Sequence, residues 1–157
     1  MAGWQVTTAT IIVHGIPAPK GSKAFKGLTK DGKAILVESS KRVKPWSEAV
    51  KWAIVDAGSP RIKGPVQVDI LFTLPRPKKY WGKKHKNAWP AVKPDGDKLL
   101  RSTWDALTQM GVIEDDSRIV KWAGEKHYEG SDYGMATPGA VIQIVAVEAA
   151  KEGGRNG

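Results

Sequence analysis

A strict alternation of apolar and polar residues between positions 65 and 74 is the feature that most constrains the fold. Every second position is apolar, at Val66, Val68, Ile70, Phe72 and Leu74. The positions between them include Gln67, Asp69 and Thr73. Because successive side chains of a β-strand point to opposite faces, this pattern predicts a strand with one buried face. Such a strand needs a second layer of structure to cover it.

Two other segments have the three- and four-residue apolar spacing of helices that could form this layer. They span residues 43–57 and 97–110 and are followed by Gly58 and Gly111, which suit helix ends. Further strands are predicted at 8–14, 34–37, 119–128 and 140–147, with a basic loop at 20–33. The order predicts an α/β or α+β fold, in which two helices pack on a mixed β-sheet of about four or five strands. We expect one domain over residues 1–148, a basic mobile loop at 75–94 and a disordered tail at 149–157.

The composition excludes several classes of protein. The chain has no cysteine, so it has neither disulfides nor thiolate metal sites, which suits a reducing cytoplasm. No apolar run approaches the ~20 residues that span a bilayer, and the N-terminus lacks the pattern of a signal peptide. The chain also lacks the Gly-x-x-x-x-Gly-Lys-Ser/Thr loop of nucleotide-binding proteins. We therefore expect a cytoplasmic protein without a membrane partner or a nucleotide cofactor.

The charges are unevenly distributed along the chain. The formal net charge is +9, yet residues 95–132 contain nine acidic residues and five basic ones. A positive field favours polyanions such as nucleic acid, whereas carboxylates next to a phosphate would repel it. A metal-dependent nuclease needs both, because bases hold the phosphates and acids hold the cation. Chance clustering of acids on a solvated surface explains the same distribution equally well.

The loop at 75–94 contains seven basic residues and no acid, and Tyr80, Trp81 and Trp89 are interleaved among them. Bases alternating with aromatic residues are typical of surfaces that bind a nucleic-acid backbone and stack its bases. Simple packing of Trp81 and Trp89 is the alternative. The residues that we expect to contact DNA are Lys20, Lys23, Arg76, Lys78, Lys79, Lys83, Lys84 and Lys93.

A group of aspartates around the second predicted helix is the candidate metal site. Asp95 suits the N-cap position, and Asp97 would lie in the first turn, where the helix dipole favours anions. Arg101 follows four residues later on the same side of the helix. After Gly111 the chain could return and bring Asp115 or Asp116 to the start of the helix. Asp95, Asp97 and Asp116 could then hold one or two Mg²⁺ ions, with Arg101 neutralising a phosphate.

A structural interpretation of the same residues stays open. Asp95 could serve only as a helix cap, and Asp97 with Arg101 could form an ordinary surface ion pair. Asp115 and Asp116 could belong to a turn.

The sequence around these aspartates resembles a known family. Residues 93–128 contain Lys-Pro-Asp-Gly-Asp-Lys-Leu-Leu-Arg-Ser-Thr-Trp-Asp-Ala-Leu, then Gly-Val-Ile-Glu-Asp-Asp-Ser-Arg-Ile-Val, and then Lys126. This string resembles the RusA-type Holliday junction resolvases, especially their phage-borne branch. Residues 15–21, Gly-Ile-Pro-Ala-Pro-Lys-Gly, are similar to the opening turn of the family.

The resemblance implies a homodimeric endodeoxyribonuclease that depends on Mg²⁺, with Mn²⁺ as a substitute. Such an enzyme resolves four-way DNA junctions by symmetric paired nicks, in recombination and repair or in phage DNA processing. The metal-binding carboxylates of the family fall on Asp95, Asp97 and Asp116, and its essential lysine falls on Arg101. Arginine keeps the positive charge but is a poor proton donor, so a proton-transfer role does not carry over. Gly96 also replaces a usually larger residue.

Residues that match the pattern in supporting roles are Lys98, Asp105 and Asp115. Two alternatives to junction resolution remain. One is a metal-dependent nuclease acting on flaps, forks or other branched DNA, and the other is a non-catalytic, basic DNA-binding module.

Overall fold

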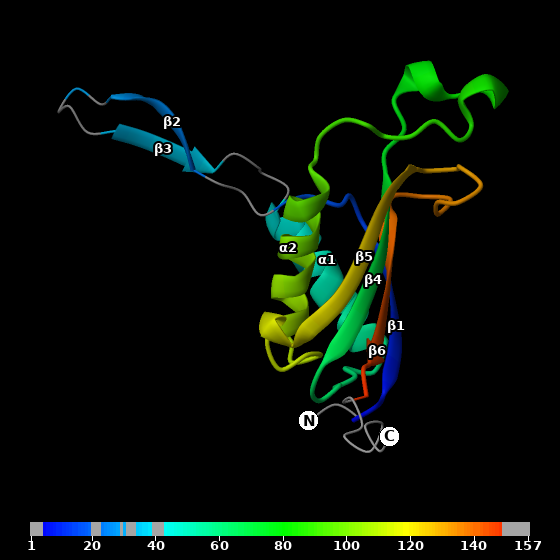
Figure 1. Cartoon of the computed structure of the whole chain (residues 1–157). Helices are drawn as coiled ribbons and strands as arrows, with labels where there is room; N and C mark the ends of the chain where they lie inside the picture. The colour runs from blue at the N-terminus through cyan, green and yellow to red at the C-terminus, as the bar shows by residue number, and fades with distance from the viewer. Residues whose placement is uncertain (1–4, 20–22, 29, 31–33, 39–42, 149–157) are drawn as a thin grey trace, which may run out of the picture.

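A mixed four-stranded sheet forms the centre of the molecule in the computed structural model (Figure 1). The structure describes residues 5–19, 23–28, 30, 34–38 and 43–148. The strand order is β1-β6-β4-β5, with β1 at Thr8–His14, β6 at Gly139–Ala146, β4 at Val66–Leu74 and β5 at Ile119–Tyr128. β6 runs antiparallel to both β1 and β4, whereas β5 pairs with β4 in parallel. β5 is therefore an edge strand.

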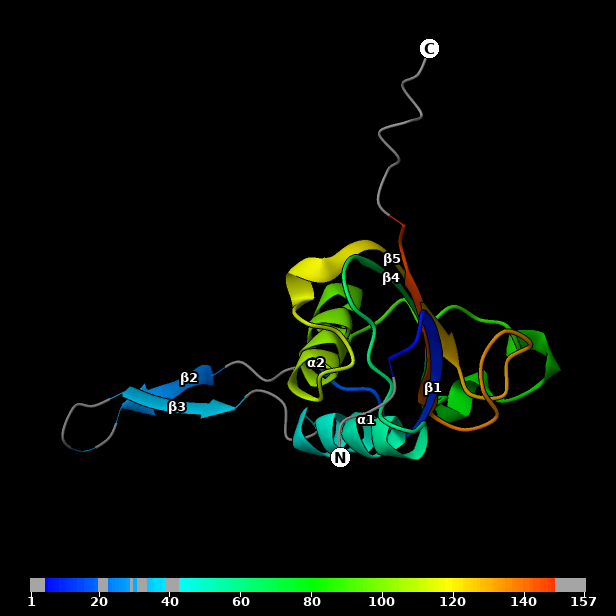
Figure 2. The ribbon, with the colours of Figure 1, turned by 90° about the horizontal axis from the view of Figure 1, so that it is seen from below.

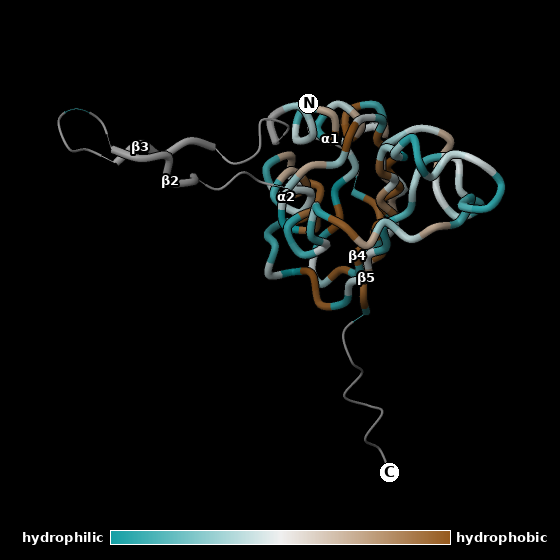
Figure 3. Tube along the Cα trace, turned by 90° about the horizontal axis from the view of Figure 1, so that it is seen from above, coloured by the Kyte–Doolittle hydropathy of each residue, from teal (hydrophilic) through white to brown (hydrophobic). Residues whose placement is uncertain are grey.

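Two helices, α1 at Val43–Asp56 and α2 at Gly96–Gln109, cover one face of this sheet (Figures 1 and 2). The apolar side chains of β4 point toward them, as the alternation predicts, and Val66, Val68 and Phe72 are almost fully buried. Trp46 of α1 packs on Phe72, and its indole nitrogen donates to the Thr103 hydroxyl of α2 at 3.2 Å. Figure 3 shows apolar stretches of the chain along the sheet and in the helices, and the buried side chains of both form one core. The α+β fold predicted from the periodicities is thus confirmed.

Most element boundaries agree with the prediction, but one strand differs. β2, at Lys23–Leu28, lies inside the segment predicted as a basic loop, and it pairs antiparallel with β3 at Ala34–Glu38. The lysines and the glycine of this segment do not give the apolar alternation of a strand. The strand is recognised only from its pairing with β3. This hairpin forms a separate two-stranded sheet and stands apart from the four-stranded one (Figures 1 and 2). The tail predicted at 149–157 lies outside the described residues.

The long basic loop between β4 and α2 contains two short 3-10 helices, η1 at Lys78–Tyr80 and η2 at Lys83–His85. It projects beyond the end of the sheet, beside the turn that joins β5 to β6 (Figure 1). Contacts from outside the loop hold its path: Asn87 exchanges hydrogen bonds with Asp132, and Lys86 forms an ion pair with Asp132 at 2.9 Å. Among the described helices, none is both long and apolar enough to cross a bilayer.

Candidate active site

The first turn of α2 presents two exposed carboxylates. Asp95 occupies the N-cap position in an extended conformation, and its carbonyl accepts the first helical hydrogen bond from Leu99 at 3.1 Å. Its side chain does not cap the helix but lies 3.6 Å from the ammonium group of Lys98. Asp97 lies in the first turn, where unpaired backbone N–H groups favour a negative charge. Both carboxylates therefore face solvent at a fixed position in the fold.

That position is fixed by contacts on both sides of α2. The Lys126 ammonium of β5 donates to the carbonyl oxygens of Val92 at 2.8 Å and Pro94 at 3.0 Å. Within the helix, Leu99 is fully buried, and the Ser102 hydroxyl donates to the carbonyl of Ala18 at 2.9 Å. The segment before the helix is thus attached to the edge strand, and the middle of the helix is attached to the segment after β1. Lys126 belongs to the family-like pattern, but its anchoring role could not be predicted from sequence.

Asp97 lines a hollow of about 450 Å³ between the start of α2 and β5. Glu125 of β5 also lines this hollow, although the strand register turns its side chain to the face of the sheet away from the helices, and the sequence prediction missed this residue. The sequence offered little indication of a role for Glu125, because an acidic residue in a strand is usually just a solvent-exposed side chain. One carboxylate oxygen of Glu125 lies 2.9 Å from Nε2 of His127, whose side chain is buried.

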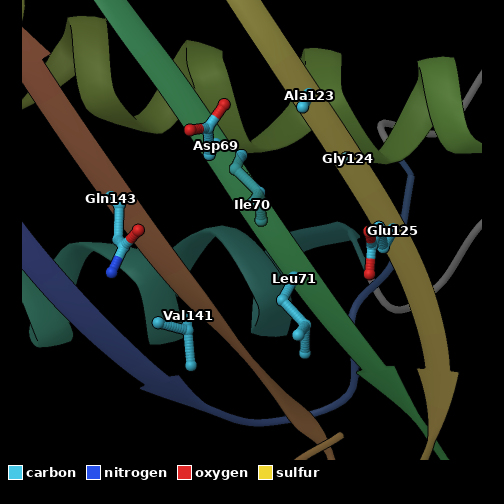
Figure 4. A pocket seen from close by; sticks show the side chains of 8 residues that line it. All are labelled: Asp69, Ile70, Leu71, Ala123, Gly124, Glu125, Val141 and Gln143. Atoms are coloured by element: carbon cyan, nitrogen blue, oxygen red, sulfur yellow. The ribbon is translucent and has the colours of Figure 1, made fainter. Parts of the chain in front are cut away.

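Glu125 also borders the face of the sheet that no helix covers. Figure 4 shows this face, with Asp69 on β4, Gln143 on β6 and Glu125 on β5 beside the apolar side chains of Leu71 and Val141. The strand register places these residues in two adjacent rows.

Arg101 lies one turn after Asp97 and is exposed, as predicted. The ion pair that was the alternative interpretation does not form: within the described residues, no contact of 4.0 Å or less joins these two side chains. The guanidinium and the Asp97 carboxylate therefore both remain available to a ligand. Asp105, two positions before Leu107 on the same helix, is half-buried.

Asp116 lies at the opposite end of α2, which corrects the predicted geometry. Its carboxylate accepts a hydrogen bond from the hydroxyl of Thr108, in the last turn of the helix. Eleven positions separate Thr108 from Asp97, which corresponds to about 16 Å along a helix axis. In the described part of the chain, no three acidic or histidine side chains are close enough to share a metal ion.

The reason for this correction is the short connection from α2 to β5. The 3-10 helix η3, at Asp116–Arg118, follows the end of α2 after six residues and leads into β5, so Asp116 stays at this end of the helix (Figure 1). Asp115 caps η3: its side chain accepts the Ser117 N–H at 2.9 Å. Hydrogen bonds from Ser117 hold the pKa of the Asp115 carboxyl below its ordinary value. Asp115 thus makes the contact that the turn interpretation expects, and its supporting role in the site stays a prediction.

Arg76 is the second correction, because it is buried and cannot contact DNA directly. Its side chain is 7% exposed, and its guanidinium donates to four backbone oxygens, those of Glu129, Tyr80, His85 and Lys86, at 2.7–3.0 Å. The ring of Trp81 lies 5.3 Å from the guanidinium carbon. Arg76 thus holds η1, η2 and the turn after β5 together. The sequence prediction took the cationic side chain of Arg76 to be exposed. In the structure its N–H donors bind backbone oxygens inside the protein.

The other predicted DNA contacts stand on the surface or lie outside the description. Five of them, all in the loop, are exposed: Lys78, Lys79, Lys83, Lys84 and Lys93. Lys20 and the side chain of Lys23 lie outside the described residues. The exposed lysines belong to the loop that precedes the Asp95–Asp97 turn in the chain.

A comparison with protein-family models gives the observation that decides the family. Residues 15–144 match the model described as endodeoxyribonuclease RusA. The chain belongs to the RusA endodeoxyribonuclease family. It is therefore a nuclease of the Holliday junction resolvase type, which excludes the non-catalytic module. A comparison with curated proteins gave no match.

The site fits the divalent-metal dependence that is general among RusA resolvases. Mg²⁺ usually takes one or two protein carboxylates and completes its shell with water and substrate phosphate. One chain offers two such carboxylates at the start of α2. Asp97 has no protein partner within the described contacts, and Asp95 has only the ion pair with Lys98 at 3.6 Å.

Proposed function

We propose that this RusA-family enzyme resolves four-way DNA junctions by symmetric paired nicks with Mg²⁺, for which Mn²⁺ substitutes. The supporting observation is the exposed Asp95–Asp97 turn with Arg101 one helical turn away, beside the lysine-bearing loop. We place the activity in the cytoplasm of a bacterial host, in recombination and repair or in phage DNA processing.

Each residue has a role that follows from its position. Asp97 and Asp95 would hold the ion at the positive end of α2. When bound, the divalent ion lowers the pKa of a coordinated water and withdraws charge from the phosphate. Arg101 would bind the non-bridging phosphate oxygens with its paired N–H groups. Lys126 keeps the carboxylate turn in place.

DNA would approach the β5 edge and the loop rather than the middle of the uncovered sheet face. Asp69 and Glu125 border that face, and their charges repel phosphates (Figure 4). The lysines of the loop lie beyond the end of the sheet, on the same side as the start of α2 (Figure 1).

The distance between Asp116 and Asp97 supports a dimeric arrangement. A single copy keeps these residues about one helix length apart. In a two-fold dimer with antiparallel α2 helices, the end of one helix lies beside the start of the other. We propose that each site takes Asp95 and Asp97 from one copy and Asp116 from the second. Two such sites related by the two-fold axis suit paired nicking of a symmetric substrate.

Apolar groups beside α2 support the same surface as the contact between copies. On the β5 edge, Val120 is 50% exposed and Trp122 is 58% exposed, and Trp122 packs edge-on against Trp104 of α2. The indole nitrogen of Trp104 is buried without a hydrogen-bond partner. Exposed apolar side chains that adjoin one another beside a helix are explained if a second chain covers them.

Mixing two inactive variants tests this arrangement. Asp97→Asn and Asp116→Asn should each abolish cleavage as homodimers. In a mixed dimer, one shared site carries both changes and the other is intact, so mixing should restore single nicks in four-way junctions. If each site lies within one copy, both sites of the mixed dimer carry a change, and the mixture stays inactive. Symmetric paired nicks by the unchanged enzyme separate junction resolution from fork or flap cleavage, which gives single cuts on forks.

A further inference from the structure

Trp89 presents an aromatic surface that the proposed cleavage mechanism does not use. Its side chain is 67% exposed, although its ring is held against the buried imidazole of His127 at 5.0 Å between centroids. Tyr133 lies on the same imidazole at 5.9 Å. Trp81 differs, because it lies over the buried Arg76 guanidinium and is part of the packing of the loop. A large ring that is held in place and yet exposed is suited to stacking on another flat ring.

A hollow of about 360 Å³ adjoins this indole. Its lining consists of Trp89, Pro90, Ala91, Gly124, Glu125 and Lys126. Gly124, Glu125 and Lys126 also line the hollow that contains Asp97, so the two hollows lie side by side along the β5 edge. A DNA strand whose phosphate lies at Asp97 would therefore place a neighbouring nucleotide next to Trp89.

The polar groups of the hollow offer hydrogen bonds of a particular kind. One carboxylate oxygen of Glu125 lies 2.9 Å from Nε2 of His127. The second carboxylate oxygen has no protein partner within the described contacts. A carboxylate accepts hydrogen bonds from the exocyclic amino group of a base, which thymine lacks. The Lys126 ammonium uses two donors on Val92 and Pro94, and its third can reach a base carbonyl or a phosphate.

We propose that this hollow binds one unstacked nucleobase of the cut strand, which stacks on Trp89 and is selected by Glu125 for an exocyclic amino group. The inference rests on the proposed junction cleavage, because a branch point supplies bases that unstack at low cost. Trp89 and Glu125 would then set which nucleotide flanks the cut, while the Asp95–Asp97 turn performs the cutting.

A binding cycle tests the stacking without requiring cleavage. The Asp97→Asn chain is titrated at one fixed salt concentration with junctions that carry a single abasic site at successive positions around the branch point. At the position that occupies the hollow, loss of the base should weaken binding roughly tenfold. Adding Trp89→Ala should weaken binding to the intact junction by a similar factor and remove the abasic effect, whereas Trp89→Phe should keep it.

Trp52 supplies a matched control, because it is also 67% exposed but lies on α1. Trp52→Ala should leave both the affinity and the abasic effect unchanged. The stacking proposal is overturned if no position shows an abasic effect, or if the effect has the same size with and without Trp89.

Base selection is tested by cleavage with each of the four bases at that position. The unchanged enzyme should cut thymine more slowly than the other three by roughly fivefold or more, and Glu125→Gln should reduce this difference. If Glu125→Gln abolishes cutting of all four substrates and weakens metal binding, Glu125 is a metal ligand and the selection proposal is wrong. If the unchanged enzyme cuts no junction with Mg²⁺, the proposed function fails, while the binding cycle still decides the stacking.

Discussion

The ammonium group of Lys126 donates to the carbonyl oxygen of Pro94 at 3.0 Å, so the edge strand β5 holds the residue immediately before Asp95. The same ammonium group donates a second hydrogen bond to the carbonyl oxygen of Val92 at 2.8 Å. The position of the carboxylate turn thus depends on a lysine of the neighbouring strand.

Replacing this lysine should reduce cleavage more than stability. Lys126→Met removes both hydrogen bonds and should lower the cleavage rate roughly 10- to 100-fold, because small displacements of reacting groups are costly. Thermal denaturation should show a loss of only about 1 kcal/mol. Lys121→Met, which removes an exposed charge from the same strand, is the control, and an equal rate loss there would indicate that charge rather than positioning is responsible.

Asp97 should be needed for chemistry but not for binding. Asp97→Asn should lower cleavage at least roughly 100-fold. Gel-shift affinity for the junction should persist or increase, because a negative charge next to the phosphates disappears. Asp56→Asn, an exposed acid on α1, should change neither quantity. Unchanged cutting by Asp97→Asn would show that the site has been placed wrongly.

Arg101 should act through its charge. Arg101→Lys should keep a measurable part of the cleavage rate, whereas Arg101→Met should lose most of it. Single-turnover assays at saturating enzyme separate this effect from weaker binding. Complete loss with lysine would indicate that the paired N–H groups are required, and no loss with methionine would remove Arg101 from the site.

Arg76 and Lys78 should behave in opposite ways although both were predicted to bind DNA. Arg76→Met leaves four backbone oxygens without their donor and should destabilise the fold by about 3 kcal/mol, measured by denaturant unfolding. Lys78→Met should leave stability unchanged and make the slope of log K against log salt shallower by about 0.9 if it contacts one duplex phosphate. A stable Arg76→Met protein with a shallower slope would reverse these assignments.

The attachment of the loop to Asp132 should be lost only in acid. The hydrogen bond from Asn87, together with Lys86, holds the pKa of the Asp132 carboxyl below its ordinary value of 3.8. Because the folded-state pKa is the lower one, this contact is fully present above pH 3.8 and is lost as the pH falls through the folded pKa. The side-chain amide signal of Asn87 in an NMR titration should move only in that acidic range, and Asp132→Asn should remove the transition. A movement near neutral pH would contradict it.

Local patterns determined how much of this structure could be predicted. The alternation in β4 and the apolar sector of α2 arise from neighbouring residues, so both elements were predicted from the sequence to within about one residue. β2 was missed because its evidence lies in its pairing with β3. The position of Asp116 depends on the direction that the chain takes after α2, which residue spacing does not reveal. The burial of Arg76 depends on carbonyl groups that three separate segments bring together.

The arrangement around Arg76 also matters for protein engineering. The guanidinium binds main-chain oxygens, which every residue type provides, so this part of the anchoring does not depend on the side chains of the residues that supply the oxygens. A library that randomises Lys79, Lys83 and Lys84 while it retains Arg76 should therefore yield mostly folded enzymes. Such a library is a practical starting point for directing a junction-cutting scaffold toward branched DNA of a chosen shape.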